Sequence, residues 1–245
     1  MSPPLVSVII PAFNATRLLG EALASIGRQA YQPLEIVVID DGSSDGTAAL
    51  ARRLDPRATV LEQSNAGPAA ARNRGIAASQ GAVIAFLDAD DVWPDNKLEI
   101  QVPWLERTPA LDVVLGQIRY EALDDRSFDG IRFDRPGGIL SNVNLGSGLF
   151  RRTVFERVGP FDESLRFSED HDWFLRAREQ GLAIAISDQV GLYYRQHEGN
   201  LTASDDAAAR GFQLAEVLKR SLDRRRQQSR GRAAALPEIP DLETP

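Results

Sequence analysis

The stretch Val83-Ile-Ala-Phe-Leu-Asp-Ala-Asp-Asp-Val-Trp93 joins five apolar residues to three carboxylates. The apolar run predicts a buried strand, and Asp88, Asp90 and Asp91 stand where that strand ends. Clustered carboxylates repel one another and cost free energy to desolvate unless a cation lies among them. A divalent cation that also holds a phosphate is the usual reason for such a cluster. The alternative is an acidic turn that caps the next helix.

Working outward from this stretch, apolar runs alternate with helical patterns through the first half of the chain. Strands are expected at residues 6–10, 35–40, 59–62 and 83–87, and helices at 18–26, 47–54, 68–79 and 96–106. This alternation is typical of parallel strands joined by right-handed crossovers, and strands without polar positions predict a sheet covered on both faces. The chain is therefore predicted to be an α/β protein with a Rossmann-like, mostly parallel central sheet flanked by helices.

The second half is less regular. Strands are expected at 112–120, 182–186 and 191–195, and helices at 153–158 and 169–180, with a short apolar stretch at 145–150. A helix from about residue 205 carries Phe212, Leu214, Val217, Leu218 and Leu222. The predicted organisation is one domain over 1–204, a C-terminal helix over 205–232 and a disordered, Pro-rich and acidic tail over 233–245.

Composition narrows the classes of function. The net charge of −7 and the pI near 5.0 argue against a nucleic-acid-binding surface. With no cysteine, neither a disulfide scaffold nor a thiolate metal site is available. We find no signal-peptide pattern and no apolar stretch of about 18 to 20 residues, the length that crosses a bilayer. The expected location is the cytoplasm, at most peripheral at the inner face of the membrane.

The predicted strands converge on one place. In open parallel sheets ligands bind outside the carboxyl ends of the strands. Four polar segments stand at such ends: 11–14, 40–47, 63–68 and 88–91. Turn residues follow strands in any protein, but this does not explain why carboxylates end two of them. A ligand site at this edge is the better interpretation.

Several of these segments resemble the signatures of inverting family-2 glycosyltransferases of the GT-A fold. The matching stretches, in chain order, are Val8-Ile-Ile-Pro-Ala-Phe-Asn14, Val38-Ile-Asp-Asp-Gly-Ser-Ser-Asp-Gly-Thr47, Asn65-x-Gly67 with Ala71-Arg72-Asn73-x-Gly75, Phe86-Leu-Asp-Ala-Asp-Asp-Val-Trp93 (the DXD motif), Val158-Gly-Pro-Phe-Asp-Glu163, Ser168-Glu-Asp-His-Asp-Trp173 and Tyr194-Arg-Gln-His197. The resemblance covers about residues 5 to 203. It implies a nucleotide-binding half at 1–93 and an acceptor and catalytic half at 94–204.

The resemblance also implies a nucleotide site. Asp40 would hydrogen-bond the base, usually uracil, because a carboxylate accepts from an imide N–H, and an aromatic ring can pack beside a flat base. Arg72 would supply positive charge beside the acidic groups, although it could equally be a helix-surface arginine. The remaining implied nucleotide contacts are Pro11, Phe13, Asn14, Gly67, Asp88 and Ala89.

For the metal, the resemblance implies Mn²⁺ or Mg²⁺ held by Asp90 and His197 with the diphosphate of the donor. Carboxylate oxygens suit both cations and a neutral imidazole suits Mn²⁺. Asp88 would take the ribose or the metal. A histidine in a polar loop is otherwise a solvated side chain.

For catalysis, the resemblance implies that Asp170 is the base that removes the proton of the acceptor hydroxyl, and that Glu169 binds or orients the acceptor. Acids before a helix also favour its N-terminal dipole, which is the alternative role. Ser147 and Trp173 would contact the acceptor or the donor sugar, although an aromatic residue on a helix equally fits a core position.

The implied activity is transfer of a sugar from a nucleoside diphosphate sugar, UDP-linked, to the hydroxyl of a glycan or lipid-linked glycan in cell-surface assembly. The basic stretch from Arg224 to Arg232 is a candidate contact with anionic lipid, or a solvated helix end. The rival functions are a phosphatase of the haloacid dehalogenase type, whose Asp-x-Asp pattern residues 88–90 satisfy, and a non-catalytic nucleotide-sugar-binding relative. No Gly-x-Gly-x-x-Gly follows the first strand, which argues against a dinucleotide-binding dehydrogenase.

Overall fold

The computed structural model describes residues 2–123, 139–140, 143–198, 200, 207–229, 235–236 and 241–242. Its strands are β1 Val6–Ala12, β2 Leu34–Asp40, β3 Thr59–Glu62, β4 Val83–Phe86, β5 Val113–Ala122, β6 Ile139–Leu140, β7 Gly148–Arg151, β8 Ile184–Gln196 and β9 Asp241–Leu242. Its helices are α1 Leu19–Gly27, α2 Thr47–Leu54, α3 Pro68–Ala78, α4 Lys97–Arg107, α5 Thr153–Val158, α6 Glu169–Glu179 and α7 Ala207–Gln228, with a 3₁₀ turn η1 at Leu145–Ser147.

Within the described ranges, nine strands form one sheet in the order β3-β2-β1-β4-β7-β5-β8-β9, with β6 paired to β5. β1 pairs in parallel with β2 and β4, and β2 pairs in parallel with β3. β7 lies antiparallel between β4 and β5, whereas β5 and β8 are parallel. The predicted α/β class and mostly parallel central sheet are confirmed.

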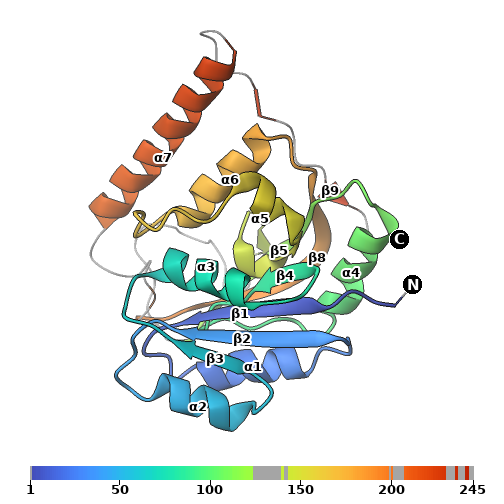
Figure 1. Cartoon of the computed structure of the whole chain (residues 1–245), viewed down its shortest axis with the longest axis vertical. Coiled ribbons are helices and arrows are strands. Elements are labelled where there is room, and N and C mark those ends of the chain that lie inside the picture. Colours follow the sequence, from blue (N-terminus) through green and yellow to red (C-terminus); the bar gives the residue numbers. More distant parts are fainter. Residues whose placement is uncertain are drawn as a thin grey trace.

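Helices cover both faces of the sheet, as the apolar strands predict (Figure 1). One core contains Leu19, Leu23 and Ile26 of α1 and Leu98, Val102 and Leu105 of α4. The core on the other face is aromatic and joins β4 and β7 to α5 and α6. Both cores bury their side chains against the same strands, so the sheet edge where β1–β4 end is rigidly supported.

α3 lies close to β1 because its residues are small. A Cβ on Gly75 would stand 2.3 Å from Ile9 Cγ2, so a larger residue would push the helix off the sheet. Gly67, with a φ of +90°, begins the helix just before Pro68, which suits the first turn. This close packing carries Arg72 to the sheet edge.

The helix expected at 96–106 is α4, which contains Pro103 in its interior. Two details differ from the sequence-based expectations. The strands expected at 182–186 and 191–195 are one strand, β8. In the tail expected to be disordered, Asp241 and Leu242 form β9 beside β8; its remaining residues, other than 235–236, lie outside the described ranges.

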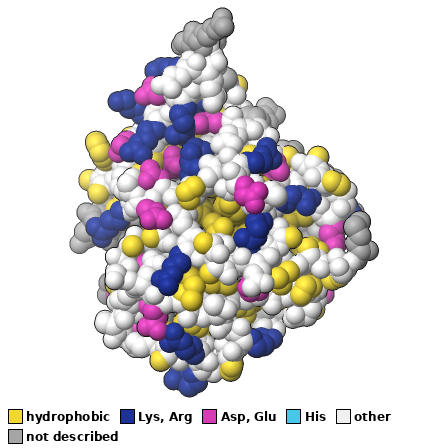
Figure 2. Space-filling view, viewed as in Figure 1, with side chains coloured by type: hydrophobic (Ala, Val, Ile, Leu, Met, Phe, Trp, Pro, Cys, Tyr) yellow, Lys and Arg dark blue, Asp and Glu magenta, His cyan; other side chains and the backbone are white. Residues whose placement is uncertain are grey.

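α7 packs beside α6 at one end of the molecule (Figure 1), and Lys and Arg side chains gather along it (Figure 2). Among the helices in the described ranges, not one has the length and apolar character that a bilayer crossing requires.

Candidate active site

The carboxyl ends of β1, β2 and β4 meet at one edge of the sheet, because these strands are parallel and in register. Ala12 stands opposite Asp40, and Ile9 stands opposite Phe86, the last residue of β4. The segments that follow each strand therefore lie together, as the sequence predicts.

The loops after β1 and β2 are held to each other. Asn14 has a φ of +47°, and its side-chain Oδ1 accepts a hydrogen bond from Ser44 N at 2.9 Å. Phe13 is 54 % exposed, so its ring is free to pack against a ligand. Asp40 is buried, and its Oδ1 accepts from Ser43 N at 2.7 Å. The predicted nucleotide contacts at Pro11, Phe13, Asn14 and Asp40 remain predictions; Phe13 and Asn14 are exposed and Asp40 is buried.

Asp41, to which the sequence assigned no role, shapes the loop after β3. Its carboxylate accepts hydrogen bonds from Gln63 Nε2 at 2.8 Å, Ala66 N at 2.9 Å and Gly67 N at 2.8 Å. The second aspartate of the Asp-Asp pair therefore positions Gly67 rather than facing a ligand.

At the end of β4, Asp88, Asp90 and Asp91 have three different environments. The side chain of Asp88 is 41 % exposed and that of Asp90 is 30 % exposed, whereas Asp91 is buried. Asp90 Oδ2 lies 3.1 Å from His197 Nε2 and 3.2 Å from Asn200 Nδ2. Asp91 Oδ1 accepts from Arg195 N at 2.8 Å.

The charges of this cluster are poorly compensated. Burial, and then the charge of Asp88, raise the pKa of Asp90, although His197 opposes this. Burial, and then the charges of Asp90 and Asp88, raise the pKa of Asp91 well above its ordinary value. A nearby cation would relieve both penalties.

Arg72 joins this cluster to the start of α6. Its Nη2 donates to Asp88 Oδ1 at 2.7 Å and its Nη1 donates to Glu169 Oε1 at 2.6 Å. Burial disfavours the charge of Arg72, but Asp88 and Glu169 raise its pKa. Burial raises the pKa of Glu169, and Arg72 opposes this. Because Arg72 is itself buried, it is a fixed bridge rather than a surface arginine.

Asp170 follows Glu169 on the first turn of α6, after Ser168 in a left-handed conformation. Its Oδ1 accepts from His171 N at 2.7 Å, and His171 Nδ1 lies 2.8 Å from the same oxygen. Burial alone would raise the pKa of Asp170, but the hydrogen bonds from His171 and the charges of His171 and Arg72 lower it. The carboxylate is thus kept ionised, as a proton acceptor must be. His171, to which the sequence gave no role, is the partner of Asp170.

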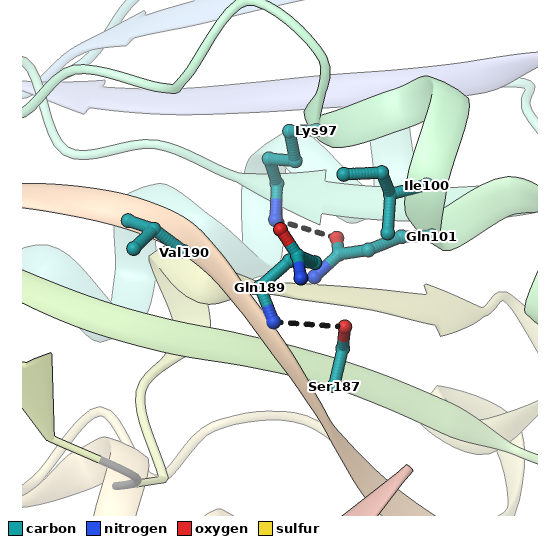
Figure 3. Close-up of a pocket in the computed structure, with 6 residues that line it drawn as sticks. All are labelled: Lys97, Ile100, Gln101, Ser187, Gln189 and Val190. Carbon is teal, nitrogen blue, oxygen red and sulfur yellow. Dashed lines mark hydrogen bonds between the residues drawn. The ribbon is translucent and has the colours of Figure 1, made fainter. Parts of the chain in front are cut away.

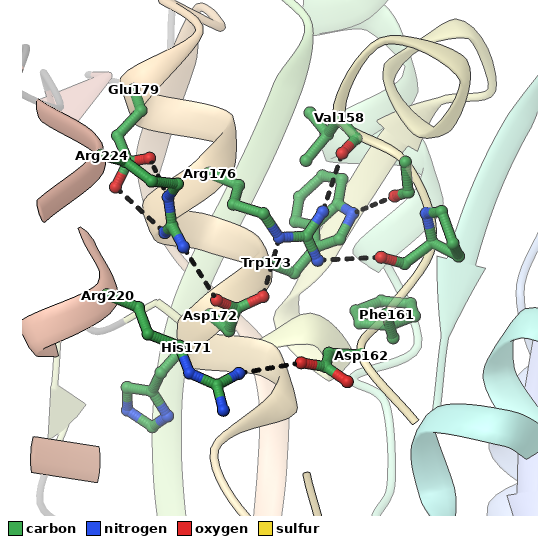
Figure 4. Close-up of polar contacts among 12 residues, drawn as sticks. Val158, Phe161, Asp162, His171, Asp172, Trp173, Arg176, Glu179, Arg220 and Arg224 are labelled. Carbon is green, nitrogen blue, oxygen red and sulfur yellow. Dashed lines mark hydrogen bonds and ion pairs between the residues drawn. The ribbon is translucent and has the colours of Figure 1, made fainter. Parts of the chain in front are cut away.

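Two predicted sugar contacts are wrong. Trp173 is completely buried, its Nε1 donates to Gly159 O at 3.1 Å, and its ring packs against Phe150 and Phe155. Phe161 also packs against this ring (Figure 4). It is a core residue because its face of α6 lies on the sheet.

Ser147 is also completely buried. Its carbonyl oxygen accepts from Lys97 Nζ at 2.7 Å and Gln101 Nε2 at 2.8 Å. Lys97 and Gln101 line a small polar pocket under β8 (Figure 3), and burial lowers the pKa of Lys97 well below its ordinary value. Ser147 therefore belongs to a sealed structural cluster and not to a sugar site.

The sequence also missed two residues that hold the acidic cluster. Arg195 is buried, and its guanidinium donates to Asp90 O and to Glu21 Oε2. Asn200 bonds Asp90 and the carbonyl of Arg195. Both lie within or just after Tyr194-Arg-Gln-His197, so that motif was the available signal.

A divalent cation fits the donor set that the structure provides. Asp90 and His197 are adjacent, as predicted, and offer one carboxylate and one imidazole, a combination suited to Mn²⁺. Within the described residues no group of three or more His, Cys, Asp or Glu side chains is arranged around a metal position. A bound cation would therefore take its other ligands from the diphosphate and water.

Comparisons with known proteins show the family to which this chain belongs. Residues 7–160 match the family model described as glycosyl transferase family 2. The chain is 30 % identical over 214 residues to the uncharacterised glycosyltransferase RT0329 of Rickettsia typhi, covering 81 % of this chain and 66 % of that protein. It is 30 % identical over 227 residues to the glycosyltransferase AglE of Haloferax volcanii, covering 85 % of this chain and 73 % of AglE. The chain thus spans about two thirds of the length of these relatives.

Solved structures show the same fold. TarS of S. aureus, residues 1–349 in complex with UDP-GlcNAc, superposes with a TM-score of 0.66 at 22 % identity, covering 81 % of this chain and 60 % of the TarS chain. The mannosyltransferase PcManGT of Pyrobaculum calidifontis, in complex with GDP-Man and Mn²⁺, superposes with a TM-score of 0.64 at 21 % identity, covering 97 % of this chain and 67 % of PcManGT. The chain belongs to glycosyl transferase family 2 and has the GT-A fold.

Proposed function

We propose that this chain transfers a sugar from a nucleoside diphosphate sugar, UDP-linked, to an acceptor hydroxyl with inversion at the anomeric carbon. The observation that carries the proposal is the Arg72 bridge, which joins Asp88 at the end of β4 to Glu169, the neighbour of Asp170. The donor groups and the base thereby share one site.

The chemistry follows from the charges of these residues. Asp170 Oδ1 is held by His171, which leaves Oδ2 to accept the proton of the acceptor hydroxyl. As that proton leaves, the hydroxyl oxygen forms a bond to the anomeric carbon, and the bond from this carbon to the diphosphate oxygen breaks on the opposite face. The electron pair of the broken bond departs with the diphosphate. Glu169, fixed by Arg72, would orient the acceptor.

A divalent cation bound by Asp90 and His197 would stabilise the negative charge that develops on the leaving diphosphate. The raised pKa values of Asp90 and Asp91 support this role, because a bound cation would stabilise the ionised form of both carboxylates.

The nucleotide is proposed to be UDP, with GDP as the alternative, since the structural neighbours carry UDP-GlcNAc and GDP-Man. The acceptor is proposed to be a hydroxyl of a glycan or lipid-linked glycan. The phosphatase alternative is not retained, because the family is shown and Asp88, its required nucleophile, is bound to Arg72.

The test is a calorimetric titration with UDP, GDP and dTDP, each with and without Mn²⁺. Metal-dependent binding of UDP is the expected result. Binding of GDP alone would change the donor and keep the class of reaction. Failure to bind any of the three would contradict the proposal, and binding without sugar turnover would favour the non-catalytic relative.

A further inference from the structure

α7 turns its larger apolar side chains away from the protein. Phe212 is 73 % exposed, Leu218 is 47 % exposed and Leu222 is 38 % exposed. These residues recur at helical spacing on one side of α7, whereas Val217 and Ser221 are buried on the other side. A helix of a globular protein normally places its apolar stripe on the core, so α7 has the reverse arrangement.

Polar contacts hold the inner side of α7. Gln213 Oε1 accepts from Phe167 N at 2.8 Å. Arg220 Nη1 donates to Asp162 Oδ2 at 3.1 Å, and Arg224 Nε donates to Glu179 Oε2 at 2.6 Å (Figure 4). Arg224 is therefore held against α6, and the lipid contact predicted for residues 224–232 remains a prediction; residues 230–234 lie outside the described ranges. The exposed side chains are not needed to attach the helix.

The helix is also strongly basic in an acidic protein. α7 contains six basic and two acidic residues, whereas the whole chain has a net charge of −7. Glu216 pairs with Arg220, and Asp223 lies 3.7 Å from Arg226. Lys219 and Arg226 are exposed on the same side as Leu218 and Leu222. We call Phe212, Leu218, Lys219, Leu222 and Arg226 the outer face of α7.

We propose that the outer face of α7 docks on the surface of an anionic lipid bilayer. An amphipathic helix with aromatic and leucine side chains beside lysine and arginine binds in the plane of the interface, with its apolar groups among the acyl chains and its cations at the phosphates. A second copy of this chain is a less suitable partner, because the basic side chains of two such faces would repel one another. An anionic surface attracts α7 and repels the acidic remainder, so charge also orients the protein.

Docking through the outer face would leave one helix, α7, between the bilayer and the segment that carries the candidate base. Gln213 bonds the backbone of Phe167, two residues before Glu169, so α7 and the segment that carries the base are in direct contact. An acceptor anchored in the bilayer would then reach Asp170. This last step rests on the proposed function, whereas the docking itself does not.

The test is sedimentation of the full chain with vesicles of equal parts phosphatidylcholine and phosphatidylglycerol, compared with phosphatidylcholine alone. Two double variants address the outer face: Phe212→Ser with Leu218→Ser, and Lys219→Glu with Arg226→Glu. The matched control is Leu54→Ser with Arg53→Glu, where Leu54 is 46 % exposed and Arg53 is exposed. Both residues lie at the end of α2, a helix far from α7 in the molecule (Figure 1). Thermal unfolding of every variant reports on folding, which these exposed positions should not disturb.

The expected result is binding to the anionic vesicles that falls at least about tenfold in each α7 variant and is unchanged in the control. No binding to anionic vesicles, or equal binding by the α7 variants and the control, would overturn the proposal. Self-association in light scattering that disappears with Phe212→Ser and Leu218→Ser, without vesicle binding, would identify a second copy as the occupant instead. Nucleotide titrations on the same variants test the two proposals separately. A variant that no longer binds vesicles should bind the nucleotide with unchanged affinity.

Discussion

The acidic cluster at the end of β4 and Asp170 at the start of α6 have pKa values shifted in opposite directions. Asp90 and Asp91 have raised pKa values, because burial and mutual repulsion disfavour their charges. Asp170 has a lowered pKa, because His171 and Arg72 outweigh its burial. The first cluster is suited to receive a cation and the second to receive a proton.

The two regions also differ in how they are held. The β4 cluster is fixed by β8 and the loop that follows it, through partners more than a hundred residues away: Arg195, His197 and Asn200. Asp170 is fixed by its immediate neighbour His171. Arg72 is the link between the regions, with one nitrogen on each. Single substitutions can therefore disable the β4 cluster, Asp170 or the Arg72 link separately.

The largest effect is expected for Asp170→Asn. An amide does not accept the proton of the acceptor hydroxyl, so transfer should fall about 10²–10⁴-fold, the usual contribution of a general base. Nucleotide affinity should not change, because the β4 cluster is untouched. Turnover with the donor found by titration measures the first quantity and calorimetry the second. Retention of most of the transfer activity would remove Asp170 from the role of base.

Breaking the link with Arg72→Gln should cost roughly 3 kcal/mol of the free energy of unfolding at neutral pH, because the buried carboxylate of Glu169 loses its cation. Urea unfolding measures this, with Arg74→Gln on the same helix as the control. Burial raises the pKa of Glu169, so this acid takes up its proton at a higher pH in the folded state than in the unfolded state. The cost of the substitution should therefore shrink as the pH falls through that raised pKa. A cost that grows at low pH would be inconsistent with this bridge.

Asp90→Asn should weaken cation binding at the β4 cluster and leave Asp170 unchanged. The Mn²⁺-dependent part of nucleotide affinity is expected to fall at least about tenfold, because one of the two proposed protein ligands is lost. Asp95→Asn, in the same segment but 68 % exposed at its side chain and paired with Arg28, is the control. Titration of the nucleotide with and without Mn²⁺ decides the outcome, and equal metal dependence in the variant and the wild type would exclude Asp90 as a ligand.

The smallest effect is expected for His171→Ala, which tests whether His171 helps to set the pKa of Asp170. The hydrogen bond from His171 helps to lower the pKa of Asp170, so its removal should raise that pKa. The acid limb of the pH–rate profile should then move to higher pH, with less than about a tenfold loss of rate above it. His171→Asn keeps a donor and should restore part of the shift. An unmoved acid limb would show that His171 does not act on Asp170.

Local pattern was sufficient for most of the fold and much of the site. Strand and helix periodicity predicted β1 to β4 and α1 to α3, because each element's apolar spacing reflects its own hydrogen bonding. The rule that parallel strands end at one edge predicted that residues after β1, β2 and β4 meet, which the register of β1 with β2 and β4 confirms.

Long-range packing decided the rest. The sequence shows where Trp173 and Ser147 stand in the chain, but it does not show that both side chains are buried and so cannot contact a ligand. Burial depends on which helices and strands cover a side chain.

The sequence by itself determined the alternating α/β architecture, the acidic residues at the sheet edge and the amphipathic pattern of α7. Only the tertiary structure decided that Arg72 bridges two carboxylates 81 residues apart in the chain, that His197 and Asn200 meet Asp90, and that the apolar stripe of α7 faces outward. The physical reason is that periodicity is set by the backbone of one element, whereas the partner of a side chain is chosen by every element that packs against it.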